Sequence, residues 1–403
     1  MTLKGKRILL GLTGGIAAYK SAELTRALIR EGASVKVIMT AKAMKFITPI
    51  TLQTLSGHPV YSDMFAPWKD AEMAHIALAD FADIFVVAPA TANTIGKIAY
   101  GIADDLLTTA IMATKARVLL CPAMNVNMLA NAAVKENMDK LSTRGYYILE
   151  PEYGELACKT AGAGRLPELS EIVEEIETIL TGKDLAGEEI LVTAGPTREP
   201  LDPVRFITNY SSGKMGYALA LMAKRRGAGV TLISGPSFLP RPRGVRFIEV
   251  ASAREMRDAV MAHFERATVI IKAAAVADYR PAVQAAAKIK KEDGMLSLAL
   301  ERNPDIIAEV GQKKGNRLLI GFAMESENLL ENAVQKMRKK NMDYIVANLV
   351  TQAGAGFQGD TNIVTIMGRN GEREELPMMD KLEVADRILN KIKDWRKTVN
   401  SER

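Results

Sequence analysis

Short apolar runs alternate with amphipathic segments along almost the whole chain, and this alternation restricts the fold more than any other feature. Runs rich in Val, Ile and Leu are typical of strands buried on both faces, and the segments between them predict helices. The expected strands are residues 7–12, 34–39, 84–88 and 117–120, followed by 190–193, 230–234, 246–250, 268–274, 318–322 and 344–347. The alternation predicts an α/β protein with two Rossmann-like domains, each a mostly parallel sheet with flanking helices.

The two series of strands meet at a polar break. A helix expected over residues 169–180 is followed by Thr-Gly-Lys-Asp at 181–184, a composition typical of domain junctions. We therefore expect one domain at residues 1–182 and a second at residues 186–403. A chain of 403 residues with 48% hydrophobic content is long enough for each domain to bury its own core.

The charge balance and the cysteine count exclude several classes of protein. The 53 Lys and Arg residues are offset by 47 Asp and Glu, and aromatic residues make up 5% of the chain. This balance, with a net charge of +6, suits anionic small molecules better than nucleic acid, for which a clustered basic face is expected. Cys121 and Cys158 form no CxxC pair and the three histidines lie far apart, so we expect neither a zinc site nor a disulfide framework.

The N-terminal apolar run at residues 8–18 follows Lys4, Lys6 and Arg7 and so imitates a signal peptide. Its glycines, and the amphipathic helix expected over residues 17–31, instead predict a strand followed by a ligand loop. No apolar stretch reaches the length of a membrane span. We therefore expect a cytoplasmic protein without a membrane partner.

The loop after the first expected strand reads GLTGGI at residues 11–16, which departs from the dinucleotide-binding pattern GxGxxG. The second strand ends in Thr40 rather than in the Asp or Glu that holds an adenosine ribose. Both departures argue against NAD. They leave either a loop suited to a single phosphate or glycines that only form a tight turn. Thr91, Asn93 and Asn125 follow the next two strands, at the edge where open α/β sheets bind ligands.

A set of motifs distinguishes the first half further: TGGI, His75, PATANTIGKIA, GIADDLL and PAMNxxM, of which PAMNxxM is the most specific. Residues 1–180, which contain this set, resemble the flavin-dependent cysteine decarboxylases, specifically the phosphopantothenoylcysteine decarboxylases. The resemblance implies an FMN cofactor, which supplies the electron sink that decarboxylation of a cysteine carboxylate needs. The FMN-binding residues that it implies are Gly14, Gly15, Ile16, Thr40, Thr91 and Asn93.

The same resemblance implies three residues for the chemistry. His75 is the acid or base near the substrate, because an imidazole titrates near neutral pH; the alternative is a structural histidine on a helix. Asn125 fixes the substrate carboxylate, or else caps a turn. Cys158 protonates the enethiolate intermediate, although a lone Cys is otherwise a small buried hydrophobe. Two positions depart from the family, which often has Gly in place of Lys159 and an aromatic residue in place of Leu129.

In the second half, the segment 195–216 reads GPTREPLDPVRFITNYSSGKMG and joins a strand exit, a polar loop and a Gly-Lys helix start. Unpaired amides at the start of a helix bind anions, so the segment predicts a site for a phosphorylated ligand. Thr208 and Met215 stand where a Walker A loop needs Gly and Ser or Thr. An ordinary P-loop ATPase is therefore disfavoured.

The remaining motifs of the second half are KAAAVADYRP at 272–281, KIK at 288–290, NPDI at 303–306, GFAME at 321–325 and KMRKK at 336–340. Their joint order resembles phosphopantothenate–cysteine ligase, which activates its acid with a nucleotide, usually CTP, through an acyl cytidylate. The CTP-binding residues implied are Lys272, Ala273, Ala274, Asp278, Lys288, Asn303, Pro304, Asp305, Ile306, Phe322, Lys336 and Lys340. The lysine runs are otherwise solvated helix faces.

The ligase resemblance also implies roles for the 195–216 segment. Ser211, Ser212 and Gly213 bind the substrate, and Asn209 stabilises the acyl intermediate, because an amide donates hydrogen bonds to developing negative charge while staying neutral. Asp278, like Asn303, either reads the base edge or helps to hold Mg²⁺. The residue types alone do not separate these two roles, nor CTP from ATP.

The order of the two halves is that of the fused bacterial and archaeal protein with both activities. The sequence therefore predicts a bifunctional enzyme of coenzyme A biosynthesis that joins 4′-phosphopantothenate to cysteine and decarboxylates the product to 4′-phosphopantetheine. The alternatives are a nicotinamide-linked oxidoreductase, for which Thr40 and Ser234 lack the expected acidic groups, and a flavin-binding regulatory protein. The resemblance further implies trimeric flavin domains and dimeric ligase domains, which together give a homododecamer.

Overall fold

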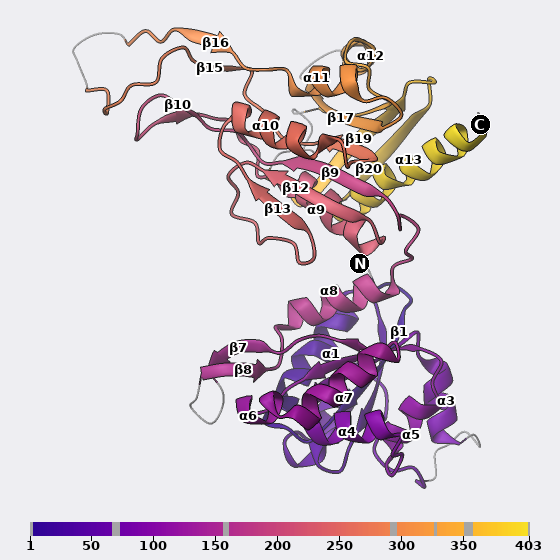
Figure 1. Ribbon diagram of the computed structural model, residues 1–403. Coiled ribbons are helices and arrows are strands. Elements are labelled where there is room, and N and C mark those ends of the chain that lie inside the picture. The colour runs from indigo at the N-terminus through magenta and orange to yellow at the C-terminus, as the bar shows by residue number, and fades with distance from the viewer. Residues whose placement is uncertain are drawn as a thin grey trace. The chain divides into compact units, whose positions relative to one another are not determined.

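The computed structural model describes residues 3–66, 73–155, 161–290, 296–325, 329–349 and 358–401. The chain divides into two compact units, Met1–Thr181 and Gly182–Arg403, and the division falls inside the polar break at residues 181–184. Strands and helices alternate along both units (Figure 1). The prediction of an α/β protein with two domains is confirmed.

The sheet of the first unit has six parallel strands, which lie in the order β3-β2-β1-β4-β5-β6. They are β1 (Arg7–Leu12), β2 (Ser34–Met39), β3 (Val60–Tyr61), β4 (Ile84–Ala90), β5 (Arg117–Pro122) and β6 (Tyr147–Ile148). The chain order reverses between β1 and β4, where Ile8 lies beside Ile84 and Gly11 beside Val87. Such a reversal is a topological switch point, and ligands bind there in doubly wound sheets.

Helices cover both faces of this sheet, because successive side chains along a strand point to opposite faces. Ile8 and Leu10 of β1 pack with helices α1, α2 and α8 on one face, whereas Leu9 packs with α3, α4, α5 and α7 on the other. The helices are α1 (Lys20–Arg30), α2 (Pro49–Ser56), α3 (Ala74–Phe81), α4 (Ala92–Tyr100), α5 (Leu106–Ala113), α7 (Ala132–Thr143) and α8 (Leu169–Leu180). The short helix α6 (Val126–Ala130) and the antiparallel pair β7 (Glu152–Glu155) and β8 (Ala161–Arg165) complete the unit.

The sheet of the second unit has eight strands in the order β13-β12-β9-β14-β17-β18-β19-β20. They are β9 (Glu189–Ala194), β12 (Gly229–Ser234), β13 (Arg246–Glu249), β14 (Val269–Lys272), β17 (Leu318–Glu325), β18 (Tyr344–Leu349), β19 (Thr361–Gly368) and β20 (Arg373–Asp380). The pairs from β13 to β18 are parallel, and β19 and β20 add an antiparallel edge. The chain order again reverses next to the first strand, here between β9 and β14.

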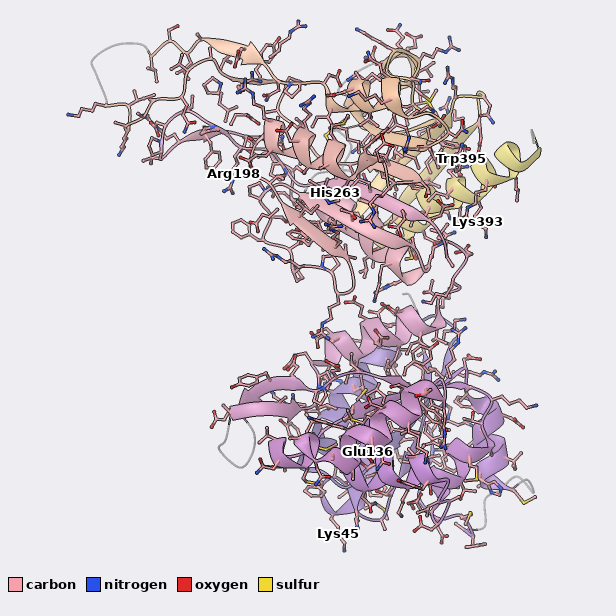
Figure 2. All side chains as sticks on the ribbon, viewed as in Figure 1. Lys45, Glu136, Arg198, His263, Lys393 and Trp395 are labelled. Carbon is pink, nitrogen blue, oxygen red and sulfur yellow. The ribbon has the colours of Figure 1, made fainter. Side chains whose placement is uncertain are left out.

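Two helical layers also enclose this second sheet (Figure 1). Ile190 and Val192 pack with α9 (Lys214–Arg225) and α13 (Lys381–Ser401), and Trp395 of α13, labelled in Figure 2, is partly buried against the same cluster. Leu191 packs on the other face with α10 (Ala253–Phe264), α11 (Ile306–Lys313) and α12 (Leu329–Lys339). Among the described helices of the chain, none combines the length and the hydropathy that a membrane crossing requires.

An arm made of two short antiparallel pairs extends from this unit (Figure 1). Its strands are β10 (Glu199–Pro200) with β11 (Phe206–Ile207), and β15 (Tyr279–Pro281) with β16 (Leu300–Arg302). The buried Asp202 carboxylate accepts hydrogen bonds from the amides of Arg205 and Ile289, and so joins the two pairs. Arg198, labelled in Figure 2, places its guanidinium 4.6 Å from the centre of the Phe206 ring.

Most expected strands and helices are confirmed, with ends shifted by a few residues. The strand expected over 268–274 ends earlier, at Lys272. The next amides bond the end of β9 and the loop that follows it: Ala273 donates to Thr193 O and Ala275 to Gly195 O. The helix expected over 17–31 begins as the 3₁₀ turn η1 (Ile16–Tyr19), a common form of the first turn. The apolar pattern did not predict β19, β20 or the arm.

Candidate functional site

A pocket of about 1080 Å³ lies at the carboxyl edge of the first sheet, at the switch point between β1 and β4. The loops after β1, β2, β4 and β5 line it, together with residues of the β7–β8 pair. All six residues that the sequence assigned to FMN contribute to the lining: Gly14, Gly15, Ile16, Thr40, Thr91 and Asn93. Small-molecule pockets span roughly 300–1,000 Å³, so this one has room for a cofactor beside a substrate.

Two contacts hold the loops together around the pocket. The buried Thr13 hydroxyl donates to the Pro89 carbonyl at 2.7 Å and accepts from the Thr91 amide at 3.0 Å, which joins the loops after β1 and β4. Gly14 packs against the loop after β2, where a Cβ atom on Gly14 would lie 2.3 Å from the Cβ atom of Lys42. A side chain at residue 14 would therefore push these two loops apart.

The charged side chains of the pocket divide into paired and unpaired groups. Lys97 Nζ lies 2.6 Å from Asp104 Oδ1 and 3.6 Å from Asp105 Oδ2. The hydrogen bond with Asp104 raises the pKa of Lys97 and lowers the pKa of Asp104. Lys20 and Lys42 also line the pocket, and in the described part of the chain neither has an ion-pair partner. These two lysines leave positive charge available to an anionic group.

Of the three residues expected to do chemistry in this unit, the structure describes two, Asn125 and His75. Asn125 lines the pocket, and its Oδ1 also accepts from the Asn127 amide at 2.8 Å, so it caps α6 as the structural alternative expected. His75 lies partly buried on α3 and is not among the residues that line the pocket. Cys158 falls outside the described residues.

In the second unit, the segment after β9 packs through its backbone. Gly195 and Gly213 have φ of 74° and 84°, in the left-handed region that favours glycine. A Cβ atom on Gly235, after β12, would lie 1.7 Å from the Pro196 carbonyl oxygen, and one on Gly213 would lie 3.3 Å from the Cα of Gly195. We call Gly195, Gly213 and Gly235 the glycine stack. Their contacts place the segment in front of α9, whose N-cap is Gly213.

Asn209 lies where the loops after β9 and β14 meet, at the second switch point. Its Nδ2 donates to the Ala275 carbonyl at 2.6 Å, and its Oδ1 accepts from the Ser211 amide at 3.1 Å. The Ser211 hydroxyl accepts from the Gly213 amide at 3.3 Å, and the Ser212 carbonyl accepts from the Ser237 hydroxyl at 3.0 Å. An amide nitrogen carries two N–H groups, so Asn209 keeps one donor beyond the bond to Ala275.

Charges converge beside this segment at the end of β14. Lys340 Nζ lies 2.8 Å from Asp305 Oδ2, and Asp305 caps α11 by accepting from the Ala308 amide at 3.2 Å. The pKa of Lys272 is lowered to about 8, chiefly by burial; the charges of Lys340 and Lys336 contribute to the lowering, and those of Asp305 and Asp278 oppose it. The structure thus brings together five of the residues predicted to bind the nucleotide.

The other residues predicted to bind the nucleotide differ from one another in exposure and in hydrogen bonding. Ala273 and Ala274 continue from Lys272, and their amides donate to the backbone and hydroxyl oxygens of Thr193. Pro304 and Phe322 are partly buried. Ile306 is buried in the core at 2% exposure, so only its backbone is open to a ligand. Lys288 lies exposed in the loop between β15 and β16, on the arm.

Sequence reasoning missed several residues around the two switch points. Thr13 opens the quoted motif TGGI but received no role there, and Lys42 carries no motif signal, because its importance depends on which loops meet in space. Lys97 and Asp104, by contrast, lie inside the quoted motifs PATANTIGKIA and GIADDLL and could have been singled out. Among the described residues, no group of three or more His, Cys, Asp or Glu side chains is placed to hold a metal ion.

The fold is that of a two-domain α/β protein, with a candidate ligand site at the switch point of each sheet. The model of the Flavoprotein family matches residues 1–181, and the model described as the DNA/pantothenate metabolism flavoprotein C-terminal domain matches residues 185–395. The coenzyme A biosynthesis bifunctional protein CoaBC of Bacillus subtilis (strain 168) is 49% identical over 394 residues, which cover 97% of this chain and 97% of that protein. The chain belongs to the family of the coenzyme A biosynthesis bifunctional proteins.

Two solved structures are also similar to parts of the chain. The crystal structure of the C-terminal domain of a coenzyme A biosynthesis bifunctional protein CoaBC is 45% identical, with a TM-score of 0.47, and covers 54% of this chain and 100% of that one. The FMN-dependent cysteine decarboxylase SpaF is 32% identical, with a TM-score of 0.40, and covers 44% of this chain and 97% of that one.

Proposed function

We propose that the chain catalyses two consecutive steps of coenzyme A biosynthesis, each in its own unit. It is a bifunctional enzyme with a flavoprotein decarboxylase domain and a phosphopantothenate–cysteine ligase domain, as its family membership over almost the full length implies. The ligase forms 4′-phosphopantothenoylcysteine from 4′-phosphopantothenate and cysteine. The decarboxylase then removes the cysteinyl carboxylate to give 4′-phosphopantetheine.

The pocket of the first unit is the proposed FMN site, and its lining is the observation that carries this part. It gathers every predicted flavin residue, it follows a glycine turn, and the unpaired Lys20 and Lys42 suit a phosphate. Gly14, Gly15, Ile16, Thr40, Thr91 and Asn93 would hold FMN, whose chemistry would supply reversible thiol oxidation and thus the electron sink that loss of CO₂ requires. Asn125 would orient the cysteinyl carboxylate, Cys158 would donate the final proton, and His75 would act as acid or base.

The FMN proposal is tested on the purified full-length protein. We expect a yellow preparation whose cofactor, released by heat, co-elutes with FMN and is present at about one per chain. A colourless protein that takes up no FMN on reconstitution would contradict the proposal. The Flavoprotein family match by itself supports a flavin, and only this measurement separates FMN from other flavins.

The charge cluster at the end of β14 carries the ligase proposal. The carboxylate of 4′-phosphopantothenate attacks the α-phosphate of CTP and pyrophosphate leaves; the cysteine amine then attacks the acyl cytidylate and CMP leaves. Lys272, Lys336 and Lys340 would neutralise the triphosphate. The remaining N–H of Asn209 would stabilise the oxyanion of the activated carboxyl group. Ser211, Ser212 and Gly213 would hold the pantothenate portion.

We assign Mg²⁺ to the nucleotide phosphates, with Asp278 as one protein ligand, because Mg²⁺ in nucleotide sites usually keeps few carboxylates. The direct test supplies 4′-phosphopantothenate, CTP, cysteine and Mg²⁺ and follows CMP and 4′-phosphopantetheine by mass spectrometry. Omission of Mg²⁺ should stop the ligation, and replacement of CTP by ATP should slow it. Ligation that proceeds unchanged in excess chelator would contradict the metal assignment.

A cytoplasmic location and an oligomeric state belong to the same proposal. We propose trimers through the flavin domains and dimers through the ligase domains, which combine into a dodecamer, as in the family that the sequence resembles. Light scattering should then give a mass about twelve times the 43.8 kDa of one chain. A monomer at micromolar concentration would contradict it.

A further inference from the structure

Arg280, on strand β15 of the arm, makes three polar contacts at the base of the arm. Its Nη1 donates to the carbonyl of Arg302 at 3.0 Å and to Asn303 Oδ1 at 2.9 Å, and its Nη2 lies 2.6 Å from Glu301 Oε1. The Arg280 side chain is only 15% exposed. A guanidinium is a rigid fork of donors, so three acceptors around it fix its position closely.

Asn303 is held at both ends of its carboxamide. Its Oδ1 accepts from Arg280, and its Nδ2 donates to the Ala277 carbonyl at 2.8 Å. This orientation of the amide is required by the partners, because a guanidinium only donates and a carbonyl only accepts. An amide that reads a base edge presents its oxygen and one N–H together. In Asn303 the bonds to Arg280 and Ala277 already use one lone pair of Oδ1 and one N–H of Nδ2, and they fix the carboxamide toward protein groups.

The backbone on either side of these contacts belongs to the nucleotide site. The Asn303 amide donates to the Asp278 carbonyl at 2.8 Å, and the Ala277 amide donates to the Thr197 hydroxyl at 3.0 Å. Two residues after Asn303, Asp305 caps α11 and pairs with Lys340. The bonds from Asn303 to Ala277 and Asp278 therefore tie the segment 273–278, which follows Lys272, to the segment 303–306, and Arg280 holds the Asn303 carboxamide from its other end.

We propose that Arg280 is a positioning residue of the ligase nucleotide site: by holding the Asn303 carboxamide it fixes the distance between segments 273–278 and 303–306, so that Asn303 serves as a clasp and does not read the base. The inference rests on the proposed ligase function and deepens it. It assigns base selection to other groups and gives Arg280 an effect on nucleotide binding without contact to the nucleotide.

The test measures ligation kinetics of the full-length protein carrying Arg280→Met, Asn303→Ala or both. Each single variant should raise the KM for CTP roughly tenfold, since each removes a charge-assisted hydrogen bond from the clasp. The kcat and the KM for cysteine should change less than about threefold, and the ratio of CTP to ATP activity should stay the same. The double variant should be no worse than the poorer single one, because both remove the same contact.

Arg302→Met is the matched control, because it removes the same charge from an exposed neighbour whose side chain makes no hydrogen bond or ion pair within the described residues. It should leave the KM for CTP within about twofold. Arg280→Lys should recover only part of the loss, since an ammonium cannot serve the same three acceptors as the guanidinium fork.

Three results would overturn the inference. A shift in the CTP-to-ATP ratio in Asn303→Ala would show that Asn303 reads the base. Additive effects in the double variant would show that the two residues act independently. A lower melting temperature of the ligase domain with an unchanged KM for CTP would reduce Arg280 to a structural role. An unaltered chain that forms no ligation product with either nucleotide would instead overturn the proposed function and this inference with it.

Discussion

The two units share a strand order around their first strand but differ at the carboxyl edge. In both sheets the third, second and first strands along the chain lie side by side in that order, as β3-β2-β1 and β13-β12-β9. The fourth strand, β4 or β14, pairs with the other side of the first strand. The first unit has there a large pocket lined by small, polar and apolar residues, and the charged side chains among them are partly neutralised, as in the Lys97–Asp104 pair. The second has a loop packed by glycines beside a cluster of three lysines and two carboxylates.

The comparison teaches that topology sets where a ligand binds and that the loops set which ligand. A flavin is a large, flat, mostly uncharged ring with one phosphate, so it needs volume and little charge. A nucleoside triphosphate carries several negative charges in a short space, so it needs cations held on separate elements. Changes in one set of loops should therefore leave the activity of the other unit intact.

Asn209→Asp should give the largest difference between the two units, because it should impair the ligase and leave the decarboxylase normal. The carboxylate would face the Ala275 carbonyl, now 2.6 Å away, and the developing charge of the activated carboxyl group. We expect the ligase kcat to fall roughly 10²–10³-fold, as for loss of one oxyanion donor. Decarboxylation of 4′-phosphopantothenoylcysteine, followed by CO₂ release, should stay normal. Asn209→Ala should lose less, and equal loss of both activities would point to misfolding.

The next largest effect should come from Lys340→Met. The change removes one cation from the triphosphate site and leaves Asp305 without its ion pair. We expect the KM for CTP to rise roughly 10–100-fold, the range for a charge-assisted contact. Lys339→Met, at the exposed neighbouring position on α12, is the control and should change the KM less than about twofold. Similar effects of the two variants would refute a specific role for Lys340.

Gly14→Ala tests the first unit by steric means. The added methyl group would lie 2.3 Å from the Lys42 Cβ atom and 3.0 Å from its backbone carbon, so the loops after β1 and β2 must separate. We expect flavin content after purification to fall about tenfold with ligation unchanged. Gly15→Ala meets its nearest atom, Thr91 Cγ2, at 3.5 Å and should lose much less flavin. Full flavin occupancy in Gly14→Ala would contradict the packing argument.

The smallest effect concerns pH and the Lys272 ammonium, whose pKa is lowered from 10.5 to about 8. A bound triphosphate favours the charged form and should raise this pKa, so CTP binding at pH 8 should take up about half a proton. The KM for CTP should rise as pH rises through about 8. Calorimetry in two buffers with different heats of ionisation measures the uptake, and the same value in Lys272→Met would assign it elsewhere.

The same lowered pKa predicts a trend in stability. The folded ligase unit binds the Lys272 proton more weakly than the unfolded chain, so the cost of burying this charge applies below pH 8. It is relieved as the pH rises from about 8 to 10.5. In Lys272→Met the free energy of unfolding should lack this upward contribution, which urea denaturation at pH 7.5 and 9.5 would measure.

Sequence reasoning predicted the fold well where a local pattern decides it. The apolar runs of β1, β4 and β9 are buried on both faces and could belong only to parallel strands. The arm was missed because its strands are short, and the eight-residue edge strands β19 and β20 were missed because polar residues interrupt their apolar ones, so that neither forms such a run. Arg280 and Asn303 show the same limit at the site: their contact depends on how β15 and β16 pair, which spacing alone does not encode.

The candidate sites were predictable to the extent that they lie directly after strands. Residues such as Thr40 and Thr91 line the pocket because every carboxyl end of a parallel sheet reaches the same edge. His75 lies on helix α3 and does not follow a strand. Within one chain it is not among the residues that line the pocket at the carboxyl edge of the sheet. Its role, like that of Cys158, stays a prediction.

The glycine stack has a consequence for anyone who wishes to redesign the ligase. A mutant library that varies Gly195, Gly213 or Gly235 would consist mainly of inactive members, because the space beside these atoms is filled by neighbouring backbone. Selection for a new acid substrate should therefore succeed through exposed positions of the same segment, such as Tyr210 at 83% exposure. The backbone that makes the site rigid thus also limits where its specificity can evolve.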